Sequence, residues 1–291
     1  MAHLIRAIAV LALALLLGGC GALQLAYNNA NALIRYKSRD YVDLNVAQRE
    51  TFRQRLARLH QWHRREELPR YADLLAEAGR RVERGVTASD IDWGIQAYRE
   101  RWGVLVGSAA AEAAPIALSL SSQQVDDIER KLSAANLDFS RERHADDPQR
   151  RVMHAATQMN RQISHWMGGL TDAQESLVLA YVRNQDILWQ WRMADRERRQ
   201  RLAIEMLRMA RDAGSLADGV SSLILRPETG RSPEYSQAVE RGDAEFRRLL
   251  LALERSATSD QRAHVLRRIN DYVQDLRALA RARKAEAGTD G

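Results

Sequence analysis

The chain has 291 residues, of which 45% are hydrophobic and 28% charged, enough to bury a substantial core in one or two domains. Its formal net charge is +6 and its pI is near 9.7, a balance that raises the question of acidic partners. A single cysteine excludes a framework of intrachain disulfides.

The first feature along the chain is an apolar run over residues 7–17, which follows Arg6 and ends in Leu17-Gly18-Gly19-Cys20. The run is about eleven residues long, which suits the roughly 7–15 of a signal-peptide core and not the roughly 18–20 that span a bilayer. This segment resembles the signal peptide and lipobox of bacterial lipoproteins. The resemblance implies cleavage before Cys20, a diacylglycerol on its thiol and an acyl chain such as palmitate on its new amine.

Lipidation of Cys20 would place the protein on a membrane of the bacterial envelope. Two or three acyl chains, at about 0.8 kcal/mol per buried methylene, anchor a protein persistently. Gly21 stands where many lipoproteins of the inner membrane have Asp, so we expect the outer membrane, facing the periplasm. The alternative is an ordinary secretory signal, with Cys20 as a small residue near its cleavage site.

The predicted export of the protein also bears on the meaning of its net positive charge. An exported protein does not meet nucleic acid, so we predict no nucleic-acid partner. The only lysines are Lys37, Lys131 and Lys284, and the dominance of arginine is explained by genome base composition. The alternative is a basic face that is attracted to acidic lipid headgroups.

The mature chain predicts helix after helix and no convincing strand. Pro69 is expected to kink or split the first long helix, and one long helix is expected to run from Leu177 through residues 192–201 to Met209. Apolar residues at helical spacing mark the elements in chain order: Phe52, Leu56, Leu59 and Trp62 or His63; Tyr71, Leu74, Ala78 and Val82; Ile91, Ile95, Tyr98, Trp102 and Leu105; Val125, Ile128 and Leu132; Val152, Ala156, Met159, Ile163 and Trp166; Leu177, Tyr181, Leu188, Trp191, Leu202, Met206 and Met209; Val239, Phe246, Leu250 and Leu253; Val265, Ile269, Tyr272, Leu276 and Leu279.

Each apolar stripe needs another helix to cover it, so we predict an all-α fold, an elongated bundle of antiparallel amphipathic helices. Breaks are expected at Gly85 and over residues 107–115, 139–147 and 226–233. No break requires a second domain. We divide the chain into a signal peptide at 1–19, a lipid anchor with an N-terminal tether or helix at 20–44, a helical domain at 45–280 and a disordered tail at 281–291.

Four short motifs predict helix starts. Each places a capping side chain three residues before a glutamine, as in a capping box. A further start is expected at Asp147-Pro148, with proline at the first helical position. The intervals between the boxes are unequal, so we interpret them as helix starts and not as tandem repeats. The boxes are Asn45–Gln48, Ser121–Gln124, Thr171–Gln174 and Thr258–Gln261.

The best candidate for chemistry is the group of His60, His63 and Glu67, which lie one turn apart on one helix face and could in principle hold zinc. Arg64 and Arg65 crowd that face with positive charge. The alternative has His63 at the edge of the core, His60 solvated and the carboxylate paired with arginine. We favour this alternative and predict no metal or cofactor site.

No other constellation favours an enzyme. The chain has no Gly-x-Ser-x-Gly elbow and no glycine-rich phosphate loop, and its one cysteine is assigned to the anchor. A glycosidase would need two carboxylates in contrasting environments, whereas Glu66, Glu67, Glu100 and Asp126-Asp127 all lie on arginine-rich faces. We therefore predict no catalytic residue and no small-molecule substrate.

Two resemblances bear on function. The lipobox together with Tyr27-Asn28-Asn29, Tyr36, Asp40–Leu44 and Trp62–Tyr71 resembles a family of proteobacterial lipoproteins of unknown function, which implies an all-helical envelope lipoprotein and no activity. Leu170–Gln174 also matches the Leu-Thr-x-x-Gln motif of small periplasmic chaperones, and Leu44–Gln48 and Leu120–Gln124 come close to it.

Two functions of different class follow. In the first, a lipid-tethered helical module binds another envelope protein as a structural or adaptor protein, through residues 62–71 or the loop at 226–233. In the second, it is a periplasm-facing chaperone that holds unfolded clients on exposed apolar residues such as those at 189–193.

Overall fold

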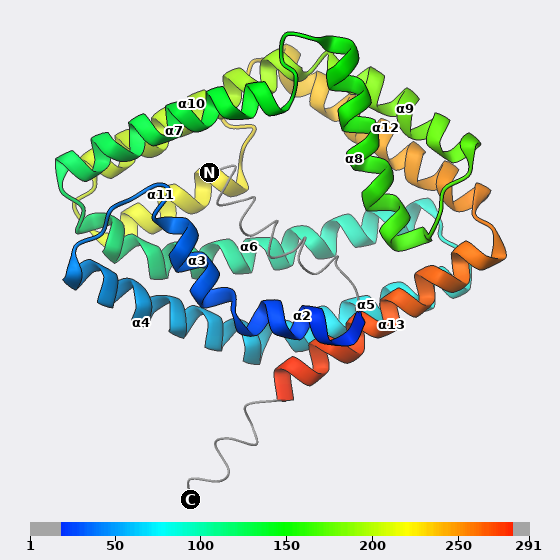
Figure 1. Cartoon of the computed structure of the whole chain (residues 1–291), viewed down its shortest axis with the longest axis horizontal. Helices are drawn as coiled ribbons and strands as arrows, with labels where there is room; N and C mark the ends of the chain where they lie inside the picture. Colours follow the sequence, from blue (N-terminus) through cyan, green and yellow to red (C-terminus); the bar gives the residue numbers. More distant parts are fainter. Residues whose placement is uncertain (1–18, 282–291) are drawn as a thin grey trace, which may run out of the picture.

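The computed structural model describes residues 19–281, without the side chains of residues 19, 20 and 22, and this part of the chain contains helices and no strand (Figure 1). The predicted all-α, multi-helix fold is confirmed. Residues 1–18 of the predicted signal peptide and 282–291 of the predicted tail lie outside the described part. The elements are α2 (Gly19–Asn28), α3 (Ala30–Ser38), α4 (Val46–Trp62), the π-helical η1 (His63–Glu67), α5 (Leu68–Glu83), α6 (Ala88–Leu118), α7 (Ser122–Glu142), α8 (Pro148–Met167), α9 (Asp172–Asp186), α10 (Trp189–Met209), α11 (Ala213–Leu225), α12 (Pro233–Ser256) and α13 (Ser259–Arg281).

The helices are arranged as packed pairs. Figure 1 shows the α7–α10 pair and the α5–α13 pair at opposite sides of the molecule, with α6 and α11 between them, and within each of these pairs the two helices are in contact. None of the helices over residues 19–281 is both long and apolar enough to cross a membrane.

All four predicted capping boxes are present. In the box that begins α9, the Thr171 hydroxyl accepts a hydrogen bond from the Gln174 amide, while the Gln174 side chain accepts one from the Thr171 amide. The boxes at α4, α7 and α13 have the same two bonds. Asp147 caps α8 with Pro148 in its first turn, so that start is confirmed as well.

The box glutamines also join the helix starts in pairs, which the sequence did not indicate. The Gln174 and Gln261 side chains exchange amide hydrogen bonds of 3.0 and 2.9 Å, and Gln174 is fully buried. Gln48 and Gln124 exchange bonds of 3.2 and 2.8 Å. Each side-chain amide donates further to a backbone carbonyl five residues before its partner: Ser119 for Gln48, Asp43 for Gln124, Ser256 for Gln174 and Gly169 for Gln261.

This pairing is part of an arrangement that occurs twice. The segments at 46–83 and 172–209 have the same length, begin with a box and are interrupted after the first four to five turns. The first segment ends in α5, which packs on α13, and the second ends in α10, which packs on α7. We call residues 45–142 the first half and residues 171–281 the second half. The helix after the interruption in each half, α5 or α10, therefore packs against the last helix of the other half. The boxes are helix starts, as predicted, and the intervals between them are unequal because the second half contains one more helix, α11.

Pro69 interrupts the first segment by a π-helical turn. The Leu68 amide donates to the His63 carbonyl, five residues back, so the turn is one residue wider than in an α-helix. The wider turn lets the chain pass a residue that lacks an amide hydrogen without ending the helix. The expected kink or split is thus realised as a bulge that leaves α4 and α5 as one continuous rod.

Two expected boundaries are wrong. The predicted long helix from Leu177 to Met209 is divided between α9 and α10, where Leu188 is buried against Tyr235 on α12. The break predicted over residues 107–115 does not occur, because α6 continues through Pro115 to Leu118. The breaks at Gly85, with φ of +90°, and at 226–233 are confirmed.

Candidate functional site at the docked N-terminal helix

The helix that begins at the predicted lipobox packs into the hydrophobic core. Leu23 and Tyr27 of α2 are buried against Leu276 and Leu279 of α13 and Leu68 of α5. A hydrogen bond of 2.9 Å from the Gln24 amide to the buried Asp275 carboxylate adds a polar contact. The segment at 20–44 is therefore fastened to the helical domain from residue 23 onward.

Tyr27 joins α2 to the π-helical turn. Its hydroxyl shares a hydrogen bond of 2.9 Å with His63 Nδ1, and its carbonyl oxygen lies 3.1 Å from His60 Nε2. The Arg64 guanidinium lies over the Tyr27 ring, 5.0 Å from its centroid, and donates to the Asn28 side chain and the Leu279 carbonyl. Two adjacent turns, the last turn of α4 and the start of η1, thus hold the C-terminal end of α2 in place.

Burial determines the protonation states of His63 and Tyr27. Desolvation, aided by the positive charge that His60 carries when protonated, lowers the pKa of His63 to about 4. Desolvation also raises the pKa of Tyr27, against the opposing effect of Arg64. Both groups are therefore neutral in the folded protein near neutral pH, and their hydrogen bond joins two uncharged partners.

Glu67 occupies the last position of the π-helical turn and is completely buried. Its Oε1 accepts hydrogen bonds from Arg70 at 2.9 Å and from Arg101 of α6 at 3.3 Å, whereas its Oε2 is buried without a hydrogen-bond partner. Burial and the charge of Glu67 raise the pKa of Tyr71. A carboxylate in this position ties the bulge to α6, since a buried charge needs its cationic partners.

The structure separates the three residues considered as zinc ligands. His60 and His63 both engage Tyr27, and Glu67 turns to Arg70 and Arg101. The described residues contain no group of three His, Cys, Asp or Glu side chains suited to a metal ion. His63 lies at the edge of the core as the favoured alternative predicted, but His60 is not solvated: it is half-buried, with its ring 4.6 Å from that of Tyr27.

The other carboxylates named from the sequence lie on the surface in separate ion pairs or hydrogen bonds. Glu66 faces Arg70 at 3.8 Å, Gln96 donates to Glu100, Asp126 pairs with Arg208, and Asp127 pairs with Arg130. No two of them are joined in one cleft, which is what acid–base hydrolysis would require.

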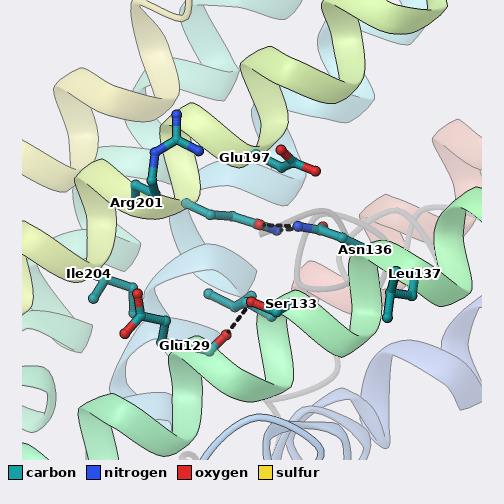
Figure 2. Close-up of a pocket in the computed structure, with 9 residues that line it drawn as sticks. Glu129, Ser133, Asn136, Leu137, Glu197, Arg201 and Ile204 are labelled. Carbon is teal, nitrogen blue, oxygen red and sulfur yellow. Dashed lines mark hydrogen bonds between the residues drawn. The ribbon is translucent and has the colours of Figure 1, made fainter.

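A groove of about 430 Å³ lies between α7 and α10 (Figure 2). Among its lining residues, Asn136 of α7 donates to Gln200 of α10 at 2.7 Å, and Arg196, which does not line the groove, donates to Asn136 at 2.6 Å. Apolar and charged side chains share the walls, and Leu137 is 62% exposed at its edge. The lining residues are Glu129, Leu132, Ser133, Asn136, Leu137, Glu197, Gln200, Arg201 and Ile204.

The three segments predicted as contact surfaces differ in how far they are exposed. Residues 62–71 are partly covered by α2 and α13, with Glu67 and Leu68 buried, whereas Arg65, Glu66 and Arg70 are exposed. The loop at 226–233 is largely exposed, although Arg198 donates to its Pro227 carbonyl. Trp189 packs on Phe139 with ring centroids 5.7 Å apart, which leaves Trp191 as the more exposed tryptophan of the 189–193 segment.

Comparison with known proteins identifies one family. No curated protein and no solved structure matches the chain. A model of a family of unknown function, DUF6279, matches residues 40–236, which includes both glutamine boxes of the first half, the π-helical turn and the groove. Because the match covers more than half of the sequence, the chain belongs to the family of unknown function DUF6279.

Proposed function

We propose that the protein is a lipid-anchored, non-enzymatic helical module that binds another protein of the cell envelope, held on the outer membrane and facing the periplasm. The observation that carries the proposal is the docking of α2. The lipobox cysteine lies in this helix, and Leu23 and Tyr27 of the same helix are in the core. An anchor at Cys20 would therefore position the whole bundle at the membrane.

The energetics of the docked helix suit such an anchor. Burial of a side chain such as Leu23 or Tyr27 contributes about 1.5–3 kcal/mol, and the hydrogen bonds of Tyr27 and Gln24 add about 1 kcal/mol each. The hydrophobic contacts and the polar contacts come from α4, η1, α5 and α13 together. Force on the acyl chains would reach the core directly, which suits a structural or adaptor role.

The groove between α7 and α10 is the best candidate for the partner contact. Apolar side chains flank amides and both signs of charge there, the mixture that protein interfaces combine. Leu137 is exposed at the groove without an intrachain cover that buries it. In Figure 1, α7 and α10 lie on the opposite side from α5 and α13, away from the docked helix.

Site-specific photo-crosslinking in cells tests this function. A photoreactive residue at Leu137 in the groove should trap one dominant envelope protein, whereas the same residue at Leu177, which is exposed on α9, should not. Equal, diffuse labelling at both positions would contradict an adaptor role. Loss of labelling at Leu137 when Glu197 and Arg201 are replaced by Ala would identify the groove as the contact.

A chaperone of the Leu-Thr-x-x-Gln type is the second candidate. The observation in its favour is a set of large apolar side chains that the fold leaves exposed, including Leu137 and Ile187. The Leu-Thr-x-x-Gln motif is not open to a client, since its Gln174 is buried and hydrogen-bonded to Gln261. A soluble form that starts at Gly21 should suppress aggregation of unrelated unfolded proteins if this function is correct, and inactivity in that assay would eliminate it.

A further inference from the structure

The outer face of α2 and α3 carries apolar side chains that no other described helix covers. Leu25 on α2 is 67% exposed and Tyr36 on α3 is 62% exposed, and the exposed Ala32 lies one helical turn before Tyr36 on the same face of α3. Leu23, Tyr27 and Ala30 lie on the opposite face and are buried. The two short helices therefore carry apolar residues both on the face that packs on the core and on the face that is exposed.

Basic side chains flank the C-terminal end of this face. Arg35, Lys37 and Arg39 are all exposed, and Lys37 Nζ lies 5.6 Å from the centroid of the Tyr36 ring. Two acids lie near them: Asp40 pairs with Lys37 at 3.4 Å, and Asp43 pairs with Lys131 at 3.2 Å, so each is matched by a cation, and the Lys37 pair is exposed on both sides and therefore weak. The surface is thus an exposed aromatic ring within a positive field.

We propose that this face, defined by Leu25, Ala32, Tyr36, Arg35 and Lys37, lies on the surface of an anionic lipid bilayer. The inference rests on the proposed lipid anchor, because Cys20 begins the same pair of helices. A helix that lies in a bilayer interface presents Leu and aromatic side chains to the acyl boundary and Lys or Arg to the headgroups. Tyrosine is enriched at headgroup depth, where its ring and hydroxyl meet different surroundings.

Geometry favours lipid over a protein partner. The sixteen-residue path from Cys20 to Tyr36 is helical apart from a turn at Asn29, so it extends at most about 24 Å at 1.5 Å per residue. Because α2 is fixed to the core, this face stays within that distance of the acyl chains and cannot swing away on a loose linker. Anionic lipid attracts each nearby cation enough to favour contact about fivefold.

The test uses the acylated full-length protein, in which acylation of the lone cysteine leaves any added cysteine as the only free thiol. Ala32→Cys places a polarity-sensitive fluorophore on the face, and Ala194→Cys, exposed on α10, is the matched control. In vesicles that contain phosphatidylglycerol, the label at position 32 should shift to shorter wavelength and be quenched by brominated acyl chains. The label at position 194 should do neither.

The contributions of charge and of the anchor are tested separately. Replacement of both Arg35 and Lys37 by Gln should reduce the fraction of label 32 at the bilayer by at least fivefold, and phosphatidylcholine vesicles should weaken it similarly. Mass spectrometry and vesicle sedimentation report the anchor independently. An acylated protein that sediments with vesicles while label 32 stays aqueous would overturn this inference and leave the proposed function intact; an unmodified Cys20 would overturn the proposed function itself.

Discussion

Acidification should destabilise the fold at the contact between α2 and His63, because the folded protein disfavours the protonated form of His63 there. The pKa of His63 is lowered from an ordinary value of 6.5 to about 4 by burial beside Tyr27, so the folded state holds the ring neutral. At a pH between these two pKa values, His63 binds a proton in the unfolded chain and not in the folded protein. The stabilising contribution is therefore complete above pH 6.5 and is lost as the pH falls towards 4.

The size of the effect follows from the same two values. The full shift corresponds to about 3 kcal/mol, and about 2 kcal/mol of it is lost by pH 5. Urea unfolding at pH 7.5 and pH 5 measures this difference for the natural protein and for His63→Gln. Gln cannot be protonated, so the variant should lose about 2 kcal/mol less than the natural protein over that interval, whatever its stability at pH 7.5.

Two results would refute this reasoning. An equal loss of stability in both proteins would mean that His63 does not resist protonation. A natural protein that gains stability relative to His63→Gln through this interval would mean that His63 is stabilised in its charged form, which is the opposite of the effect expected from its burial beside Tyr27 and Arg64.

Three further substitutions test the contacts individually in urea unfolding. Gln174→Ala should destabilise by about 2 kcal/mol because it leaves buried amide groups unpaired, whereas the exposed Gln54→Ala should change little; equal effects would refute the role of the glutamine pair. Tyr27→Ala should cost about 3 kcal/mol and open α2 to proteolysis, against almost nothing for Tyr36→Ala. Glu67→Ala should cost about 3 kcal/mol by leaving Arg101 unpaired, and Glu67→Gln clearly less; the reverse order would contradict the ion pair.

Local signals in the sequence explain which features were predictable. A capping box acts within four residues, so the starts of α4, α7, α9 and α13 were all found from the sequence alone. The apolar stripes also predicted the all-α class. The exchange between Gln174 and Gln261 links residues 87 positions apart, and no local pattern distinguishes a glutamine that only caps from one that also joins two helices.

The errors have physical causes as well. Leu188 fits the apolar stripe of a continuous helix, but burial against Tyr235 ends α9 before it, so tertiary packing overrode periodicity. Pro69 predicted an interruption, yet the π-helical turn is accompanied by a contact between Glu67 and Arg101 of α6, 34 residues away, which no local pattern indicates. Tyr27 was noticed only through a family resemblance, because its partners His60 and His63 lie beyond two helix ends.

The central claim is that a lipid on Cys20 anchors the docked helix, and mass spectrometry of the mature N-terminus from the native host tests it most directly. We predict a first residue at position 20 whose sulfur carries a thioether-linked diacylglycerol. An unmodified thiol at Cys20, or a mature chain that begins at another residue, would contradict it.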